Sequence, residues 1–167
     1  MKWLPYENFY IDTNLKPDAA QRALGTEVGP DPGVTFRNIF SERSGLYFVG
    51  NIGNGIFQIR RQIYYRNSFL PRITGTIEAY INGSRVHVKM KLHLFVTIFM
   101  CMWMGGVFLA GIGLIATGSA TGVGPIALIP FGMFLFGYAL IMGAFKFESA
   151  KAKRTLAQIF QGSIEEA

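Results

Sequence analysis

The sequence predicts an α+β membrane protein, in which a cytoplasmic domain built on an antiparallel β-sheet is joined to a transmembrane helical hairpin and a C-terminal amphipathic helix. Three observations predict this class. No Asp, Glu, Lys, Arg or His occurs from Phe95 to Phe145. Apolar and polar residues alternate strictly from Val86 to Leu94, as in a strand with one buried face. Two Asn-Gly pairs, at 54–55 and 82–83, mark tight hairpin turns.

Residues 1–93 form the predicted cytoplasmic α+β domain. Residues 8–15 carry a strand pattern, and residues 16–25 carry a helix pattern with Pro17 in the first turn and Gly25 at the end. Hairpins centred on 54–55 and 82–83 follow. The order of strand, helix, hairpins and final helix resembles the helix-grip order, interrupted by the spans. At the level of architecture, the domain is also similar to bacterial pleckstrin-homology-like modules at the membrane.

The hairpin at 82–83 has the clearest predicted register. If the chain turns at Asn82-Gly83, Ile73 lies opposite Leu92 and Glu78 lies opposite His87. One face of the two strands is then apolar throughout and the other is polar throughout, which is the pattern of a sheet with one buried face.

Residues 94–146 form the predicted transmembrane hairpin, with spans at about 95–117 and 126–145. Each span is long enough as a helix to cross a hydrocarbon core of roughly 30 Å. Residues 1–94 carry 12 Lys and Arg against 7 Asp and Glu, and residues 146–167 carry 4 against 3. By the positive-inside rule, we expect a multi-pass protein of the bacterial inner membrane with both termini in the cytoplasm.

Residues 147–167 are predicted to form a cytoplasmic amphipathic helix and tail. Phe147, Ala150, Leu156, Ile159 and Phe160 fall roughly on one helical face. Such a helix either lies on the membrane or folds back to cover the apolar face of the sheet. The need of a one-sided sheet for a cover favours the second alternative.

The basic strand that ends near Leu94 enters the first span without a linker. We therefore expect the sheet to sit at the cytoplasmic surface of the bilayer, with Lys89, Lys91 and His93 at headgroup depth. Each basic residue there is attracted to anionic lipid by about 1 kcal/mol. The junction is also a stiff coupling between sheet and span.

Basic residues are the candidates for binding a ligand or a lipid headgroup. A run of basic and aromatic residues at 59–72 has the composition of a phosphate-binding surface, because arginine offers a planar bidentate donor. Ordinary positive-inside charge, headgroup contact and a specific small anionic ligand all remain open as explanations. The candidates are Arg60, Arg61, Arg66, Arg72, Arg85, Lys89 and Lys91.

No motif for catalysis or for a cofactor is evident. The two histidines, His87 and His93, lack neighbouring Cys, Asp or Glu at the spacing of a metal site, so we expect neither a metal ion nor an enzyme. Small residues in the first span favour close helix packing, either within the hairpin or against another subunit. These are Gly105, Gly106, Ala110, Gly111 and Gly113.

The runs "YRNSFLPRITGTI", "FVTIFMCMWMGG", "IPFGMFLFGY" and "FESAKAKRTLAQIF" resemble a group of small bacterial proteins with two spans and a β-rich cytoplasmic domain. This resemblance carries no activity with it. We expect a non-catalytic accessory or binding protein, whose sheet binds a protein partner, a lipid headgroup or a small anion, within an oligomer or larger complex. Nucleic acid is not expected as a partner.

At the level of architecture, the chain is also similar to membrane effectors of bacterial antiviral signalling. That similarity implies an alternative function, in which a cyclic nucleotide bound to the sheet makes the two spans oligomerise and disrupt the membrane. The same stiff junction between strand and span would transmit the signal.

Overall fold

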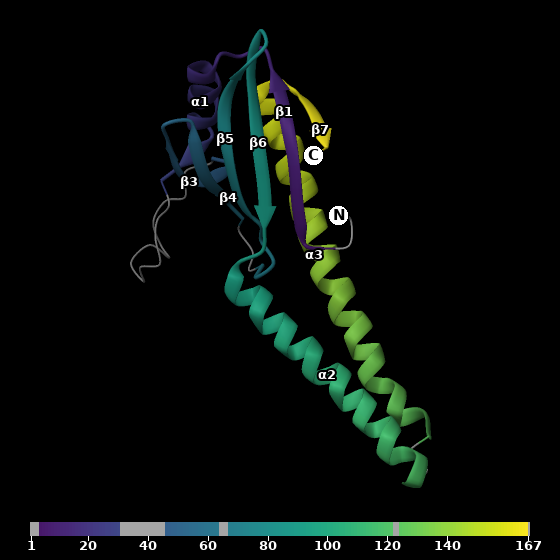
Figure 1. Cartoon of the computed structure of the whole chain (residues 1–167). Helices are drawn as coiled ribbons and strands as arrows, with labels where there is room; N and C mark the ends of the chain where they lie inside the picture. The colour runs from purple at the N-terminus through teal and green to yellow at the C-terminus, as the bar shows by residue number, and fades with distance from the viewer. Residues whose placement is uncertain (1–3, 31–45, 64–66, 122–123, 167) are drawn as a thin grey trace.

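The computed structural model describes residues 4–30, 46–63, 67–121 and 124–166. Figure 1 shows a sheet domain at one end of a pair of long helices, with both described ends of the chain in that domain. The elements are, in chain order, β1 (Tyr6–Thr13), α1 (Pro17–Gly25), β2 (Val28–Gly29), β3 (Phe48–Gly53), β4 (Ile56–Arg61), β5 (Arg72–Tyr80), β6 (Gly83–Lys91), α2 (Leu94–Thr121), η2 (Gly124–Leu128), α3 (Ile129–Phe160) and β7 (Ser163–Glu166).

The described strands form one seven-stranded sheet in the order β2-β3-β4-β5-β6-β1-β7. All neighbouring strands are antiparallel except β2 and β3, which are parallel. The expected purely antiparallel sheet is therefore mixed at one edge. A parallel pair needs a connection of a dozen or more residues, and residues 30–47 supply one between β2 and β3.

One face of the sheet is covered by α1 and by the second half of α3, which lie on the same side in Figure 1. The final helix therefore docks on the sheet. Leu156 and Phe160 are completely buried there, and burial of each such side chain contributes about 1.5–3 kcal/mol. The core between sheet and helices contains Phe9, Ile11, Ala20, Leu24, Phe57, Ile59, Ile73, Ile77, Val86, Val88, Met90, Phe145, Ala152, Leu156 and Phe160.

The sequence predicted that the covering helix is separate from the second span, but the structure joins the two. A single helix, α3, runs through the second apolar segment and on along the sheet to Phe160. No glycine or proline occurs between Ala144 and Phe160, so no residue there breaks the helix. Phe147 and Ala150, which were expected on the apolar face, are exposed.

The residues after α3, which were expected only as a tail, form a strand, β7. The helix ends at Phe160, and Gln161, which follows it, has a left-handed φ of 48°. Thr13 donates a 2.5 Å hydrogen bond to the carbonyl oxygen of Phe160. A side chain on Gly162 would lie 2.5 Å from the Asp12 carbonyl oxygen. The chain thus turns tightly against β1, and β7 pairs with it as an edge strand.

The two hairpins differ in how they use their Asn-Gly pairs. Asn54 and Gly55 join β3 to β4, and both have the positive φ that a tight hairpin turn requires, 51° and 74°. In the second hairpin Tyr80 pairs with Gly83, so the turn consists of Ile81 and Asn82, one residue earlier than expected.

The register of the second hairpin is therefore shifted by two residues. Ile73 lies opposite Met90 rather than Leu92, and Glu78 lies opposite Arg85 rather than His87. A side chain on Gly83 would come within 2.0 Å of the Thr13 carbonyl oxygen. Gly83 is thus needed inside β6 for the close approach of β1. A shift of two residues preserves which side chains share a face.

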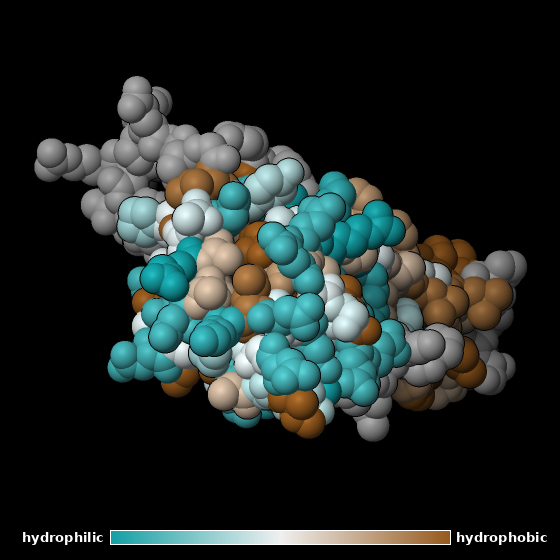
Figure 2. Space-filling model, turned by 90° about the horizontal axis from the view of Figure 1, so that it is seen from above, coloured by the Kyte–Doolittle hydropathy of each residue, from teal (hydrophilic) through white to brown (hydrophobic). Residues whose placement is uncertain are grey.

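The helices α2 and α3 are long and apolar enough to cross a membrane. Only 6% and 11% of their most apolar windows are buried inside the structure, unlike the core helices of a soluble protein. Figure 2 looks onto the domain from the end farthest from these helices, where hydrophilic residues dominate the surface. Among the described residues, most of the large exposed apolar side chains lie on α2, η2 and α3.

The two helices touch through aromatic residues and two glycines. A Cβ on Gly111 would lie 2.9 Å from the Phe131 ring, and one on Gly137 would lie 2.6 Å from the Trp103 ring. Phe108 packs edge-on against Phe131, with ring centroids 6.0 Å apart. Of the small residues expected to pack helices, Gly111 lies in this contact, whereas Gly105, Gly106, Ala110 and Gly113 are exposed.

Candidate functional site

The face of the sheet opposite α1 and α3, which we call the open face, carries most of the candidate basic residues. Arg60 on β4 pairs with Arg72 on β5, and Arg72 pairs with Lys91 on β6. These three side chains are exposed and point from the same face. We call Arg60, Arg72 and Lys91 the cation row.

Like charges directly opposite one another on neighbouring strands destabilise a sheet, because their Cβ atoms are only about 4.5–5.5 Å apart. The cation row places two such pairs side by side. On its outer side lies Tyr6 of β1, whose ring centroid is 5.5 Å from the Lys91 Nζ atom. The opposed charges of Arg72 and Lys91 therefore carry an electrostatic cost that a bound anion would offset.

A second row lies two residues farther along the strands and is mainly neutral. One residue from each of four strands contributes to it: Gln58 of β4, Thr74 of β5, Lys89 of β6 and Asn8 of β1. We call these four residues the amide row. Among the described residues of the cation row and the amide row there is no carboxylate. The two rows together thus form a cationic surface with neutral hydrogen-bonding groups beside it.

The cation row lies at the end of the sheet from which α2 departs. Lys91 is the last residue of β6, and α2 begins at Leu94. Arg72 begins β5, and Arg60 is the second-last residue of β4. Figure 1 shows β1, β5 and β6 running roughly toward the helix pair.

Arg61 lies on the covered face, unlike its neighbour Arg60. Its guanidinium pairs with Glu148 of α3, and the side chains of Arg61 and Glu148 are 14% and 1% exposed. Strand alternation explains this placement, since Phe57 and Ile59 on the same face are buried core residues. Arg61 thus contributes a buried ion pair between β4 and α3 instead of charge on the open face.

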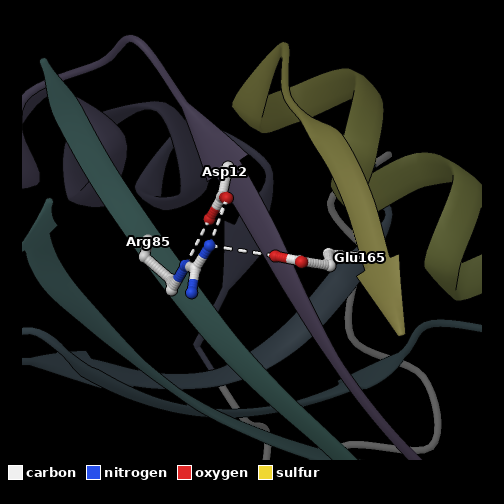
Figure 3. A network of polar contacts seen from close by, with 3 residues as sticks. All are labelled: Asp12, Arg85 and Glu165. Atoms are coloured by element: carbon white, nitrogen blue, oxygen red, sulfur yellow. Dashed lines mark hydrogen bonds and ion pairs between the residues drawn. The ribbon is translucent and has the colours of Figure 1, made fainter. Parts of the chain in front are cut away.

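Arg85 lies at the far end of the open face and is held by two carboxylates (Figure 3). It donates two hydrogen bonds of 2.6 Å to Asp12 and one of 2.9 Å to Glu165. These bonds hold the pKa of the Asp12 carboxyl below its usual range and raise the pKa of Arg85. The guanidinium also lies 4.1 Å from the Tyr80 ring centroid. This network fastens β7 to β1 and β6.

His87 occupies the middle of the open face as a neutral side chain. Burial lowers the pKa of His87, and the charge of Lys89 lowers it further, whereas Glu78 opposes the shift. Its Nε2 atom lies 2.7 Å from the Asn8 Oδ1 atom, to which it donates. The imidazole stacks on Tyr10 with ring centroids 4.6 Å apart. The histidine therefore orders β1 against β6.

Of the remaining candidate residues, Lys89 belongs to the amide row and Arg66 lies outside the described residues. His93 is at the start of α2, where its Nδ1 atom accepts a 3.2 Å hydrogen bond from the Phe95 N–H. Within the described ranges no group of three or more His, Cys, Asp or Glu is placed to hold a metal ion.

No protein-family model, curated protein or solved structure matches this chain. The candidate site therefore rests on the geometry of the open face.

Two residues of this region were not anticipated from the sequence. Lys146, the first charged residue after the long apolar segment, pairs with Glu7 near the start of β1. Tyr6 borders the cation row. Both depend on the pairing of β1 with β6, which joins residues more than seventy positions apart. The short strand pattern at 8–15 carried no signal for that partner.

Proposed function

We propose that this chain is a non-catalytic, two-span protein of the bacterial inner membrane whose sheet domain binds anionic lipid headgroups through the cation row. In this proposal α2 and α3 cross the bilayer and the sheet domain, with both ends of the chain, lies in the cytoplasm. The domain has a helix-grip-like arrangement, in which α3 is both the second span and the helix that covers the sheet.

The observation that carries the proposal is the alignment of Arg60, Arg72 and Lys91 at the helix-proximal end of the open face. Lys91 is three residues from the start of α2, a chain length of at most about 10 Å. The headgroup layer on each side of a bilayer is about 5–8 Å thick. Long basic side chains reach several ångströms farther, so the row is within reach of lipid phosphates.

The electrostatics of the domain agree with this placement. Near an anionic leaflet each Lys or Arg contributes about 1 kcal/mol of attraction. The carboxylates of the open face lie at its far end, where Asp12 and Glu165 bind Arg85. Positive charge thus faces the lipid and the paired charges face away from it.

A charge reversal tests the proposal. The full chain in a neutral detergent is titrated with phosphatidylglycerol or phosphatidylcholine, and bound lipid is counted by native mass spectrometry. We expect the wild type to retain phosphatidylglycerol in preference, and Arg72→Glu/Lys91→Glu to lose that preference. The matched control is Lys16→Glu/Arg154→Glu, which makes the same change in net charge at exposed sites outside the row.

Equal retention of the two lipids by the wild type would contradict the proposal. If the control variant also loses the preference for phosphatidylglycerol, that preference is an effect of net charge. This result would contradict the role of the cation row. When the chain is extracted from its host, the same spectra show whether it is a homo-oligomer or carries a foreign subunit. Both associations are expected from the small residues of the first span.

A further inference from the structure

We infer that the open face binds a phosphate ester whose substituent is uncharged and carries hydroxyl groups, such as glycerol, in preference to esters of an amine or of a plain alcohol. This inference rests on the proposed function and names the ligand class of the same site. A phospholipid headgroup and a soluble polyol phosphate share this chemistry, and the experiment below separates these two sources.

The position of the phosphate follows from two cations that lie opposite each other. Arg72 of β5 and Lys91 of β6 are cross-strand partners with exposed side chains, and like charges so placed repel each other. A phosphate between them relieves that repulsion and accepts hydrogen bonds from both, since the planar guanidinium of arginine is a bidentate donor for phosphate. The phosphate therefore lies over the β5–β6 pair, at the end of the open face nearest α2.

The side chains next to this position are neutral. Thr74 follows Arg72 by two residues on the same face of β5, about 7 Å along the strand. Gln58 of β4 lies opposite Thr74, and Asn51 of β3 lies opposite Gln58 and extends the amide row by one strand. All three side chains are exposed. In a lipid the acyl chains lie on the membrane side of the phosphate, so the headgroup substituent extends away from α2 and over these side chains.

These neutral side chains can form further hydrogen bonds. Among the described residues, the amides of Asn51 and Gln58 have no hydrogen-bond partner. The Thr74 hydroxyl has only a 3.5 Å contact to the Lys89 carbonyl oxygen, which is at the outer limit for a hydrogen bond. Side-chain amides and hydroxyls both donate and accept hydrogen bonds. A ligand hydroxyl does the same, so it can bond to any of the three side chains in either direction.

The surface does not suit a substituent with a positive charge. Neither the two rows nor Asn51 supplies a carboxylate that could pair with an ammonium group. Lys89, which lies opposite Thr74, would repel such a group. On β5 the first carboxylate after Thr74 is that of Glu78, about 14 Å farther along the strand. An uncharged substituent with hydroxyl groups is therefore the class that matches this surface.

The test compares lipids that carry the same charge and differ in their hydroxyl groups. The full chain in neutral detergent is titrated with phosphatidylglycerol or with phosphatidylethanol, and bound lipid is counted by native mass spectrometry. We expect phosphatidylglycerol to bind about fivefold more tightly, which is the effect of one further hydrogen bond. Gln58→Ala/Thr74→Val should abolish this factor and still bind phosphatidylethanol in preference to phosphatidylcholine.

The matched control makes the same two kinds of substitution away from the open face. It is Thr155→Val/Gln158→Ala on α3, which packs on the opposite face of the sheet, and it should keep the factor. In a parallel arm, glycerol phosphate is compared with propyl phosphate, which carries the same charge without the hydroxyl groups.

Each outcome decides between the two claims. A preference for phosphatidylglycerol over phosphatidylethanol that only Gln58→Ala/Thr74→Val removes supports a lipid headgroup with hydroxyl groups. A preference for glycerol phosphate over propyl phosphate with the same pattern, without any preference among the three lipids, supports the polyol-phosphate site but overturns the lipid function. Equal binding within both pairs overturns this inference, whereas a remaining preference for phosphatidylglycerol over phosphatidylcholine would leave the proposed function standing. A preference that survives Gln58→Ala/Thr74→Val, or that the control variant also loses, overturns the inference too.

Discussion

Single residues on the open face serve two different purposes, according to whether their charge is paired. Arg85 is bound by two carboxylates and joins three strands, whereas Arg72 and Lys91 stand opposite each other as like charges. His87 belongs to the first group, since it is neutral and bonded to Asn8. Structural residues therefore lie at the centre and far end of the face, and candidate ligand residues lie nearest the helices.

The neutral state of His87 predicts a pH dependence of stability. Its folded pKa lies below the value of about 6.5 for an unfolded histidine. Below that pH the unfolded chain binds more protons than the folded one, so stability falls as the pH falls. Between about pH 7.5 and pH 5 we expect the Tm of the wild type to drop roughly 2 °C more than that of His87→Gln.

Thermal unfolding followed by circular dichroism in detergent measures this difference. His93→Gln is the comparison variant, because it removes the other histidine and leaves the His87 site unchanged. If His87→Gln shows the same fall in Tm as the wild type, the lowered pKa of His87 is wrong.

The faces of the strands could be predicted from the sequence, but the cation row could not. Alternation places Arg60, Arg72 and Lys91 on the polar side of their strands. Their alignment depends on the register, and the expected register would have placed Arg72 opposite His93. The error came from Gly83, which resembles a turn residue in the sequence but is required by a strand from the other end of the domain.

Among the elements, α3 has the most unusual position, because one unbroken helix is both a candidate span and part of the core of the sheet domain. The buried ion pair of Arg61 and Glu148 joins it to β4 close to the cation row. Composition indicated an apolar segment and an amphipathic segment. It did not indicate that no break separates them, nor that four residues after Phe160 would add a strand to β1.

The ion pair between β4 and α3 predicts a large effect of a single substitution. Glu148→Ala leaves the Arg61 charge buried without its carboxylate, and we expect the free energy of unfolding to fall by about 3–5 kcal/mol. Arg61→Met/Glu148→Leu removes both charges and should recover most of that loss. Denaturant titration in detergent measures both. Glu7→Gln, at the more exposed pair with Lys146, should cost at most about 1 kcal/mol.

If Glu148→Ala costs no more than Glu7→Gln, the pair between β4 and α3 does not hold these elements together. If Arg61→Met/Glu148→Leu is as unstable as Glu148→Ala, the loss of stability comes from altered packing at this position and not from the unpaired charge of Arg61.

On the scale of the whole molecule, the chain leaves the sheet domain once, through α2, and returns once, through α3. Its two described ends therefore lie in the same domain, in the neighbouring strands β1 and β7. Any membrane crossed by both helices has the whole sheet domain on one side and the turn around η2 on the other. For such a membrane, the positive-inside rule applied to the uneven charge of the sequence predicts that the domain lies in the cytoplasm.

Cysteine labelling tests this topology. In a Cys101→Ser background, which removes the single native cysteine, we expect Ile126→Cys in η2 to react with a membrane-impermeant maleimide in intact spheroplasts. Ser163→Cys in β7 should react only after the membrane is opened. The reverse pattern would place the sheet domain outside the cell, and labelling of both sites in intact spheroplasts would contradict two spans.

The unbroken α3 has a mechanical consequence. A helix of 32 residues is a rod about 48 Å long, and a transmembrane helix adapts to bilayer thickness by tilting. A change in tilt of about 10° displaces one end of such a rod by about 8 Å relative to the other. Because the upper part of this rod is packed into the sheet domain, the domain must rotate with it. The height of Arg72 and Lys91 above the lipid phosphates would then vary with membrane thickness. A change in thickness and a change in anion binding would both follow from the tilt of α3.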